Sequence, residues 1–280
     1  MGVITQNVQS ASAAEGSSPP RAQGSAHVAV ARKAGRTRLQ DLRQSGALKL
    51  VFPRRHGVDD VEAVAVNTAG GITGGDRFFL TANVGAGAHL RLTTQAAERV
   101  YRAQSGSGQV STQITVGQGA KLHWLPQETI LFEGGALRRR FAVDLAQDAQ
   151  FLLVEPLVFG RQAMGEDLSR FLLDDRIIVR RAGQPLYFDG TRLTTGAQLQ
   201  RGAQVGGARA AAQVVMVGPM AAASLPVVRS HLPATAGASL IGDDLLVVRM
   251  LAADSFAMRQ DLLPILDHLT DNQLPTSWRL

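Results

Sequence analysis

The chain has 280 residues, with 29 lysines and arginines against 23 aspartates and glutamates, which gives a formal net charge of +6. Hydrophobic residues make up 45% of the sequence, and cysteine is absent. This composition supports a substantial buried core, so it excludes a wholly disordered chain, a coiled coil and a collagen-like fibre. Without cysteine, the chain can form no disulfide scaffold, thiolate metal site or cysteine-nucleophile site.

The basic charge does not by itself indicate a nucleic-acid partner. Proteins that bind nucleic acids cluster their basic residues on one element and supply aromatic side chains for stacking. Aromatic residues make up only 5% of this chain, and its longest basic run is residues 138–140. We therefore predict no nucleic-acid partner, and the positive charge equally suits an acidic protein partner.

Residues 1–26 are rich in Ser, Ala, Gly and Gln and lack hydrophobic periodicity, so we predict a flexible tail before one domain over residues 27–280. The tail has no basic start followed by an apolar run, which is the pattern of a secretory signal. The uncharged segment 210–228 contains Pro219 and Pro226, and it indicates a buried strand and a short helix rather than a membrane span. We expect a cytoplasmic protein with no membrane association.

Most of the chain has the two-residue periodicity of β-strands. Two faces alternate cleanly between Gln109 and Val116, which predicts a half-buried strand. Similar runs occur at Val61–Val66, Phe78–Val84, His89–Thr94, Lys121–Leu125, Leu137–Leu145, Phe151–Glu155, Arg176–Val179 and Leu245–Met250. Turn residues separate these runs at intervals of about 8–12 residues, which is typical of an all-β sandwich, barrel or helical stack.

Helical periodicity is weak before residue 200 and strongest near the C-terminus. There, four apolar residues recur at helical spacing: Met258, Leu262, Leu266 and Leu269. Asp254 or Ser255 is a candidate N-cap, and Pro264 predicts a kink or a division into two pieces. A further short helix is possible at Gln95–Arg102. We predict a mainly β domain with one or two short helices toward its C-terminal half.

No local catalytic or metal motif stands out. The six histidines are scattered without ligand spacing, and the HExxH pattern is absent, so we expect no metal cage built from local ligands. The pattern GxSxG does not occur in the strand–turn–helix context of a nucleophile elbow.

A glycine cluster at residues 67–78 is the most unusual local feature. Gly70 and Gly75 have Walker A spacing, but Asp76 occupies the position of the phosphate-binding lysine and would repel phosphate. The Rossmann pattern GxGxxG is also absent. The glycines fit either a tight hairpin or bulge with positive φ values, or a close approach of the backbone to a ligand or partner with Asp76 held at the turn.

Five segments in chain order resemble the UreD family (UreH in some organisms) of urease accessory proteins. They are AVNTAGGITGGDRF at 65–78, TTQAAERVYRAQSG at 93–106, LHWLPQETILFEGG at 122–135, EPLVFGRQAMGE at 155–166 and LLVVRMLA at 245–252. The opening stretch 35–54 is also similar to the family. Each segment is modest alone, but their order and spacing are quite specific.

The resemblance implies a β-rich, helix-poor fold, described for the family as an elongated β-helical or stacked-sheet single domain. It also implies a non-enzymatic chaperone and scaffold that binds apo-urease and the accessory protein UreF, which in turn docks the GTPase UreG. The assembly helps deliver nickel to the dinuclear urease site, so nickel is expected to pass through the protein's interior. No tightly bound cofactor is expected, only nickel in transit.

Nickel accepts imidazole, carboxylate and water ligands, and it binds more tightly than most divalent ions. A conduit must therefore bind it weakly, which isolated carboxylates with water do better than a histidine cage. Asp76 is the first candidate for a carboxylate on the nickel path, and Glu166 is the second. Each equally suits a carboxylate that accepts backbone N–H bonds in a turn. His123, where many relatives have glutamate, is a weaker candidate ligand.

Four further residues of the similar segments are candidates for partner binding or structure. Trp124 is a large apolar anchor for the core or for a partner. Tyr101 and Arg102 end the possible short helix at 95–102, which suits a docking element. Arg161 is expected to pair with Glu155 or Glu166, or to anchor an interface.

Two other functions remain open from the sequence. One is a β-helical or β-sandwich carbohydrate hydrolase that pairs Asp76 with Glu166 or Glu155, and it requires two carboxylates about 5–10 Å apart. The shortage of aromatic residues for sugar stacking counts against it. The other is a plain interaction module, which differs from the scaffold only in whether nickel flux depends on its carboxylates.

Overall fold

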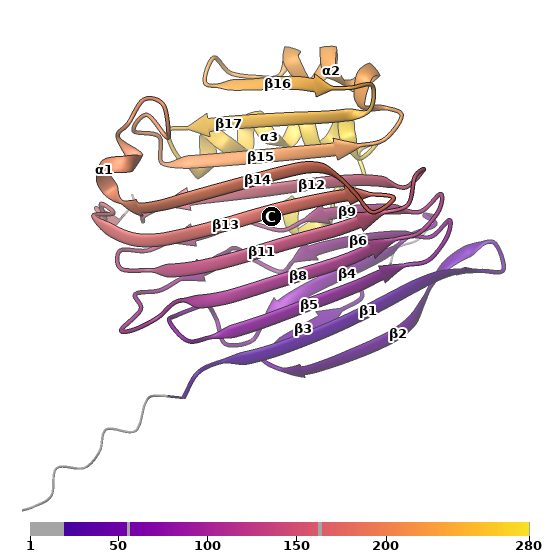
Figure 1. Ribbon diagram of the computed structural model, residues 1–280, viewed down its shortest axis with the longest axis horizontal. Coiled ribbons are helices and arrows are strands. Elements are labelled where there is room, and N and C mark those ends of the chain that lie inside the picture. Colours follow the sequence, from indigo (N-terminus) through magenta and orange to yellow (C-terminus); the bar gives the residue numbers. More distant parts are fainter. Residues whose placement is uncertain (1–19, 55–56, 162–163, 280) are drawn as a thin grey trace, which may run out of the picture.

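The computed structural model describes residues 20–54, 57–161 and 164–279. Two β-sheets face each other, and Figure 1 shows the seven-stranded sheet in front of the larger one. The seven-stranded sheet runs in the order β14 (Gln184–Thr195), β13 (Arg170–Arg181), β11 (Ala136–Leu145), β8 (Gly108–Val116), β5 (Arg77–Val84), β1 (Gln23–Lys33) and β2 (Arg36–Gly46). The ten-stranded sheet runs in the order β16 (Ala236–Ile241), β17 (Leu245–Ala252), β15 (Ala210–Val217), β12 (Gln150–Phe159), β9 (Lys121–Leu125), β6 (His89–Thr94), β4 (Val61–Asn67) and β3 (Leu48–Val51), with β10 (Thr129–Leu131) and β7 (Glu98–Val100) paired beside it.

Apart from the short strands β7 and β10, consecutive strands in the middle of the chain alternate between the two sheets. Strands β4, β6, β9 and β12 lie parallel to one another in the larger sheet, and β5, β8, β11 and β13 lie parallel in the smaller one. The chain therefore winds as a β-solenoid, and this confirms the expected mainly β, helical or stacked-sheet domain with few helices.

Antiparallel strands end the stack on both sides. The β1–β2 hairpin and β3 form one end, whereas β14 ends the smaller sheet at the other. There the larger sheet continues through β15, β17 and β16 (Figure 1). The two sheets are thus unequal in extent at this end, which is where the candidate site lies.

The protein has two apolar clusters, one on each face of the larger sheet. The inter-sheet cluster fills the space between the sheets with residues such as Leu122, Phe141 and Leu153. The helix-covered cluster packs the other face of β12, β15 and β17 against α2 (Ala221–Ser230) and α3 (Ser255–Leu269). Because successive side chains of a strand point to opposite faces, Leu153 and Val154 of β12 belong to different clusters.

The sequence predicts most of the central strands. Each alternating run identified above lies within a strand, and the expected ranges of β6 and β9 coincide with the observed ones. The segment 210–228 forms β15 followed by the start of α2, as predicted. Asp254 caps α3 by accepting a hydrogen bond from the Ala257 N–H at 2.8 Å, and Pro264 lies inside that helix.

Three expectations require correction. The possible helix at Gln95–Arg102 is wrong, because its centre forms the short strand β7, which pairs with β10. The flexible tail cannot extend to residue 26, since β1 begins at Gln23 and buries Ala26; residues 1–19 lie outside the described residues. The turn at Gly70–Gly75 connects strands of different sheets rather than forming a hairpin within one sheet.

Two short helical segments, α1 (Gly196–Leu199) and the 3₁₀ turn Thr276–Trp278, complete the described elements. No helix in the described part of the chain has the length and apolar character needed to span a membrane.

Candidate functional site

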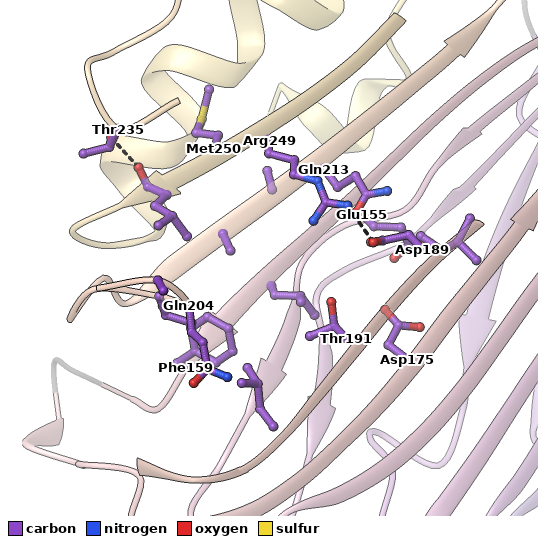
Figure 2. Close-up of a pocket in the computed structure, with 18 residues that line it drawn as sticks. Glu155, Phe159, Asp175, Asp189, Thr191, Gln204, Gln213, Thr235, Arg249 and Met250 are labelled. Atoms are coloured by element: carbon purple, nitrogen blue, oxygen red, sulfur yellow. Dashed lines mark hydrogen bonds and ion pairs between the residues drawn. The ribbon is translucent and has the colours of Figure 1, made fainter. Parts of the chain in front are cut away.

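A cavity of about 390 Å³ lies where the smaller sheet ends, between β13 and β14 on one side and β12, β15 and β17 on the other. Figure 2 shows Asp175, Asp189 and Glu155 gathered near Arg249 and Gln213 toward one end of this cavity. Phe159 and Gln204 lie toward its other end. The cavity therefore has a polar, acidic end inside an otherwise apolar fold.

Glu155 meets Arg139 and Asp175 across the space between the sheets. The Arg139 guanidinium lies 2.5 Å from Glu155 Oε2 through Nη1, and 2.6 Å from Asp175 Oδ2 through Nη2. Its Nε donates a second hydrogen bond to Asp175 Oδ1 at 3.0 Å. Glu155 and Asp175 are buried, and Arg139 is largely buried. We call these three residues the junction.

A second cavity of about 100 Å³ begins on the other side of the junction. Glu155 lines both cavities, and Arg139 lines the second one. Glu98 of β7 also faces the second cavity, and the Asn67 amide donates to both of its carboxylate oxygens at 3.2 Å. The rest of the lining is mainly apolar. Four carboxylates thus line these two adjoining cavities: Asp189, Asp175, Glu155 and Glu98. We call them the carboxylate row.

Burial raises the pKa of two members of the row. For Glu155 this upward shift in pKa is opposed by the Arg139 guanidinium. Burial likewise raises the pKa of Glu98 to about 7, and the Asn67 amide opposes this shift. A carboxylate with such a pKa exchanges a proton readily at neutral pH, and on losing it becomes an oxygen ligand for a cation.

Asp76 lies elsewhere and has different partners. It is buried at the end of the glycine loop, where Oδ1 accepts from the Ala22 N–H and Oδ2 from the Thr73 N–H, both at 2.8 Å. Its carboxylate therefore ties the loop to the start of the domain, in the manner of the turn carboxylate considered above. A role for Asp76 in nickel transfer stays a prediction.

The glycines of this loop allow the chain to approach itself closely. A Cβ atom at Gly71 would overlap the ring of Tyr101, and one at Gly74 would overlap the carbonyl oxygen of Ser105. Gly75 also has a positive φ of 90°, a conformation that side chains disfavour. Contacts within the chain are sufficient to account for this cluster.

Glu166 forms an ion pair with Arg161 near the surface. Arg161 Nη2 lies 3.0 Å from Glu166 Oε1, and its backbone N–H donates to Oε2 at 3.0 Å. The same guanidinium stacks over the ring of Phe132, 4.4 Å from its centroid. The alternative pairing of Arg161 with Glu155 is wrong, because Arg139 occupies that place.

The remaining candidates divide between the interior and the surface. Trp124 donates from Nε1 to Glu155 Oε1 at 2.7 Å, so it holds one oxygen of the junction. Tyr101 is 38% exposed and packs edge-on against Phe132. Arg102 is exposed and bridges to Gly135 through its backbone.

His123 does not belong to the junction. It follows Leu122 and precedes Trp124 on β9, so its side chain points to the opposite face of the sheet from theirs. There it is buried, with its ring edge-on to that of His89 at 4.8 Å between centroids. The structure therefore does not bring Asp76, Glu166 and His123 together.

Sequence reasoning missed Glu98, Arg139, Asp175 and Asp189, and it considered Glu155 only as an ion-pair partner or hydrolase acid. The alternation of inward and outward residues along a strand carries a signal that identifies two of the junction residues. Arg139 lies between the inward residues Leu137 and Phe141, and Glu155 lies between Leu153 and Leu157. A charged residue at an inward position of a strand is unusual enough to mark a functional site.

No group of three or more His, Asp or Glu side chains suited to holding a metal ion occurs within the described residues. The hydrolase alternative gains no support from the geometry. Neither Asp76 nor Glu166 lines the two cavities that contain Glu155, and both oxygens of Asp76 already accept backbone hydrogen bonds.

Comparison with known proteins identifies the family. The model of the family described as "UreD urease accessory protein" matches residues 22–279. A curated UreD protein of Ruegeria sp. (strain TM1040) is 54% identical over 94% of this chain and 92% of its own. A curated UreD protein of Roseobacter denitrificans is 48% identical over 93% of this chain and 96% of its own. A UreD protein of Rhizobium leguminosarum bv. viciae is 42% identical over 94% of this chain and 97% of its own. The chain therefore belongs to the UreD family of urease accessory proteins, whose members are chaperone-type proteins rather than enzymes.

Proposed function

We propose that this protein is a scaffold that assists nickel delivery to apo-urease, and that nickel passes through its interior along the carboxylate row. In this proposal it binds UreF, and through UreF the GTPase UreG, and it works in the cytoplasm. Family membership supports the general role. The two adjoining cavities, which share the wall residue Glu155, support the route.

The position of the carboxylates is the observation that carries the route. Burying a charged group between two sheets is costly unless it is paired or used. Nevertheless, Glu155, Asp175 and Glu98 occupy inward positions on strands of both sheets. Their oxygens are ligands that nickel accepts.

The route differs from the residues first predicted for it. Asp76, Glu166 and His123 lie outside the two cavities, and each has contacts that suit a structural role. We therefore place the path at the carboxylate row rather than at these three residues.

The decisive experiment for the route is urease activation at limiting nickel with the Glu155→Gln variant. This change keeps the shape of the side chain but removes its charge, so we expect activation below about one tenth of the wild-type rate. Asp144→Asn is the matched control, because Asp144 is an exposed carboxylate of β11 that pairs loosely with Arg180. Normal activation by Glu155→Gln would overturn the route and leave a plain interaction module.

The partners are tested separately by co-purification. Tagged UreF, co-expressed with this chain, is expected to recover it in a stoichiometric complex, and UreG and apo-urease are then added in turn. The Glu155→Gln variant is expected to join the same complexes, since its side chain is buried. A soluble wild-type chain that ignores UreF would contradict the proposed assembly.

A further inference from the structure

Each member of the carboxylate row is held by a hydrogen-bond donor of the protein itself. Arg249 lies 2.6 Å from Asp189, Arg139 holds both Asp175 and Glu155, and the Asn67 amide bonds Glu98. Only at the junction does one donor serve two carboxylates from different sheets. The further inference concerns this shared donor, and it rests on the proposed nickel route.

Two carboxylates around one buried point would normally trap a dication. Attraction between opposite charges strengthens as water is excluded, and nickel binds oxygen ligands more tightly than most divalent ions do. A site of this kind would store nickel rather than release it. A route through the junction therefore needs something that weakens cation binding without removing the carboxylates.

We propose that Arg139 is a resident competitor for the cation, which keeps the junction from trapping nickel in transit. Its guanidinium occupies the oxygens of Glu155 and Asp175 that a dication needs as ligands. An arriving cation must displace this fork from at least one carboxylate, and the returning guanidinium then helps to expel the cation. The junction binds nickel weakly because it is already occupied by a cation of its own.

The surroundings of Arg139 allow such an exchange. Its Nη1 also donates to the Thr129 hydroxyl at 3.3 Å, so the guanidinium keeps a partner when it leaves Glu155. Glu155 in turn keeps the Trp124 N–H at its other oxygen. Asp175 holds the guanidinium through two hydrogen bonds, which favours a swing away from Glu155 about a fixed end.

The test measures nickel binding by protein whose fold is checked by circular dichroism, because an unfolded chain with six histidines also binds nickel. The Arg139→Gln variant, purified with its partner where it needs one, is dialysed to equilibrium against Ni²⁺ alone. We expect a site that binds nickel at least tenfold more tightly than the wild type does. The matched control is Arg140→Gln, because Arg140 pairs with Asp174 one residue along the same two strands but on the outer face. That control is expected to bind as the wild type does.

Two further variants keep the proposal falsifiable if Arg139→Gln folds poorly. Arg139→Lys retains the charge but not the planar fork, so it is expected to tighten nickel binding about two- to fivefold. Arg139→Gln combined with Asp175→Asn removes the competitor and one carboxylate together, and it is expected to return to within about threefold of the wild type. Unchanged nickel binding in Arg139→Lys, or in a folded Arg139→Gln, would overturn the proposal.

The failure of this inference is distinguishable from the failure of the proposed function. If Glu155→Gln abolishes activation while the Arg139 variants bind nickel like the wild type, the route holds and the competitor role is wrong. If Glu155→Gln activates normally, the route itself fails, whatever the Arg139 variants retain.

Discussion

Asp76 and Glu155 are equally buried carboxylates that are held in opposite ways. Each is 4% exposed. Asp76 accepts only from backbone N–H groups that the loop fixes in place, whereas Glu155 contacts the movable side chains of Trp124 and Arg139. Glu155 also lines two cavities. Burial alone therefore does not separate a structural carboxylate from a functional one; the kind of partner and the space beside it do.

The largest effect is expected at the structural member of this pair. Asp76→Ala leaves the partly buried N–H groups of Ala22 and Thr73 without their acceptor, so the free energy of unfolding should fall by about 2–4 kcal/mol. Urea denaturation measures it. Asp148→Ala is the control, since Asp148 accepts one exposed N–H from Gly119 and should cost less than about 1 kcal/mol. A stable Asp76→Ala protein that fails to activate urease would reverse the comparison.

Trp124→Phe removes the hydrogen bond from the Trp124 side chain to Glu155. The Trp124 N–H lowers the pKa of Glu155, so its removal should raise this pKa further and shift the pH dependence of urease activation to higher pH. Stability should fall by about 1–2 kcal/mol. Trp278→Phe is the control, because the Trp278 N–H bonds the Leu125 carbonyl instead and should cost similar stability without the pH shift. Equal pH profiles for both variants would argue against control of Glu155 by Trp124.

Glu98→Gln should alter how stability depends on pH. Because the folded-state pKa of Glu98 is raised to about 7 from 4.5, the folded protein holds its proton more tightly than the unfolded chain does. This contribution to stability is full below pH 4.5 and is lost as the pH rises to 7.

Glu98→Gln should therefore flatten the fall in stability between pH 5 and 7, by at most about 1.4 kcal/mol per pH unit. Urea denaturation at pH 5, 6 and 7 tests this. Glu133→Gln serves as the control, since hydrogen bonds from Ser169 lower the pKa of Glu133 despite desolvation and take its titration below this window. An unchanged slope in Glu98→Gln would mean that Glu98 is ionised throughout.

The smallest effect is expected at Glu166. Its ion pair with Arg161 is partly exposed, so Glu166→Gln should change the free energy of unfolding by less than about 1 kcal/mol, and less still at high salt. Thermal melting at low and high ionic strength measures this. Urease activation should be unchanged, and a marked loss would return Glu166 to the nickel path.

Local sequence pattern predicts strands of the smaller sheet, such as β5 and β8, because their buried and exposed residues largely alternate. Strands β6 and β9 of the larger sheet are mostly buried, yet the ranges predicted for them coincide with the observed ones. The sequence pattern does not predict strand β2, because this strand lies at an edge of its sheet and is mostly exposed, so it has no apolar face. Strand β7 has three residues, too few to establish a period, and Gln95–Arg102 therefore resembled a helix.

The candidate site was predictable only in part. Its acidic residues come from β7, β12, β13 and β14, and the order of these strands in the sheets is not encoded in any local spacing. Asp76 was a candidate because it follows a glycine cluster, which is a local pattern that the sequence alone makes visible. The inward positions of Arg139 and Glu155 can be predicted from the alternation of residues along their strands. Their pairing cannot, because it depends on which strands face each other.

Strand β12 has a mechanical consequence for the assembly. Val154 packs under the helices, while the next residue, Glu155, belongs to the junction. A close-packed strand cannot yield on one face without displacing the other, because interiors of this density transmit strain. A displacement of α2 or α3 would therefore reach the junction through a single peptide unit of β12.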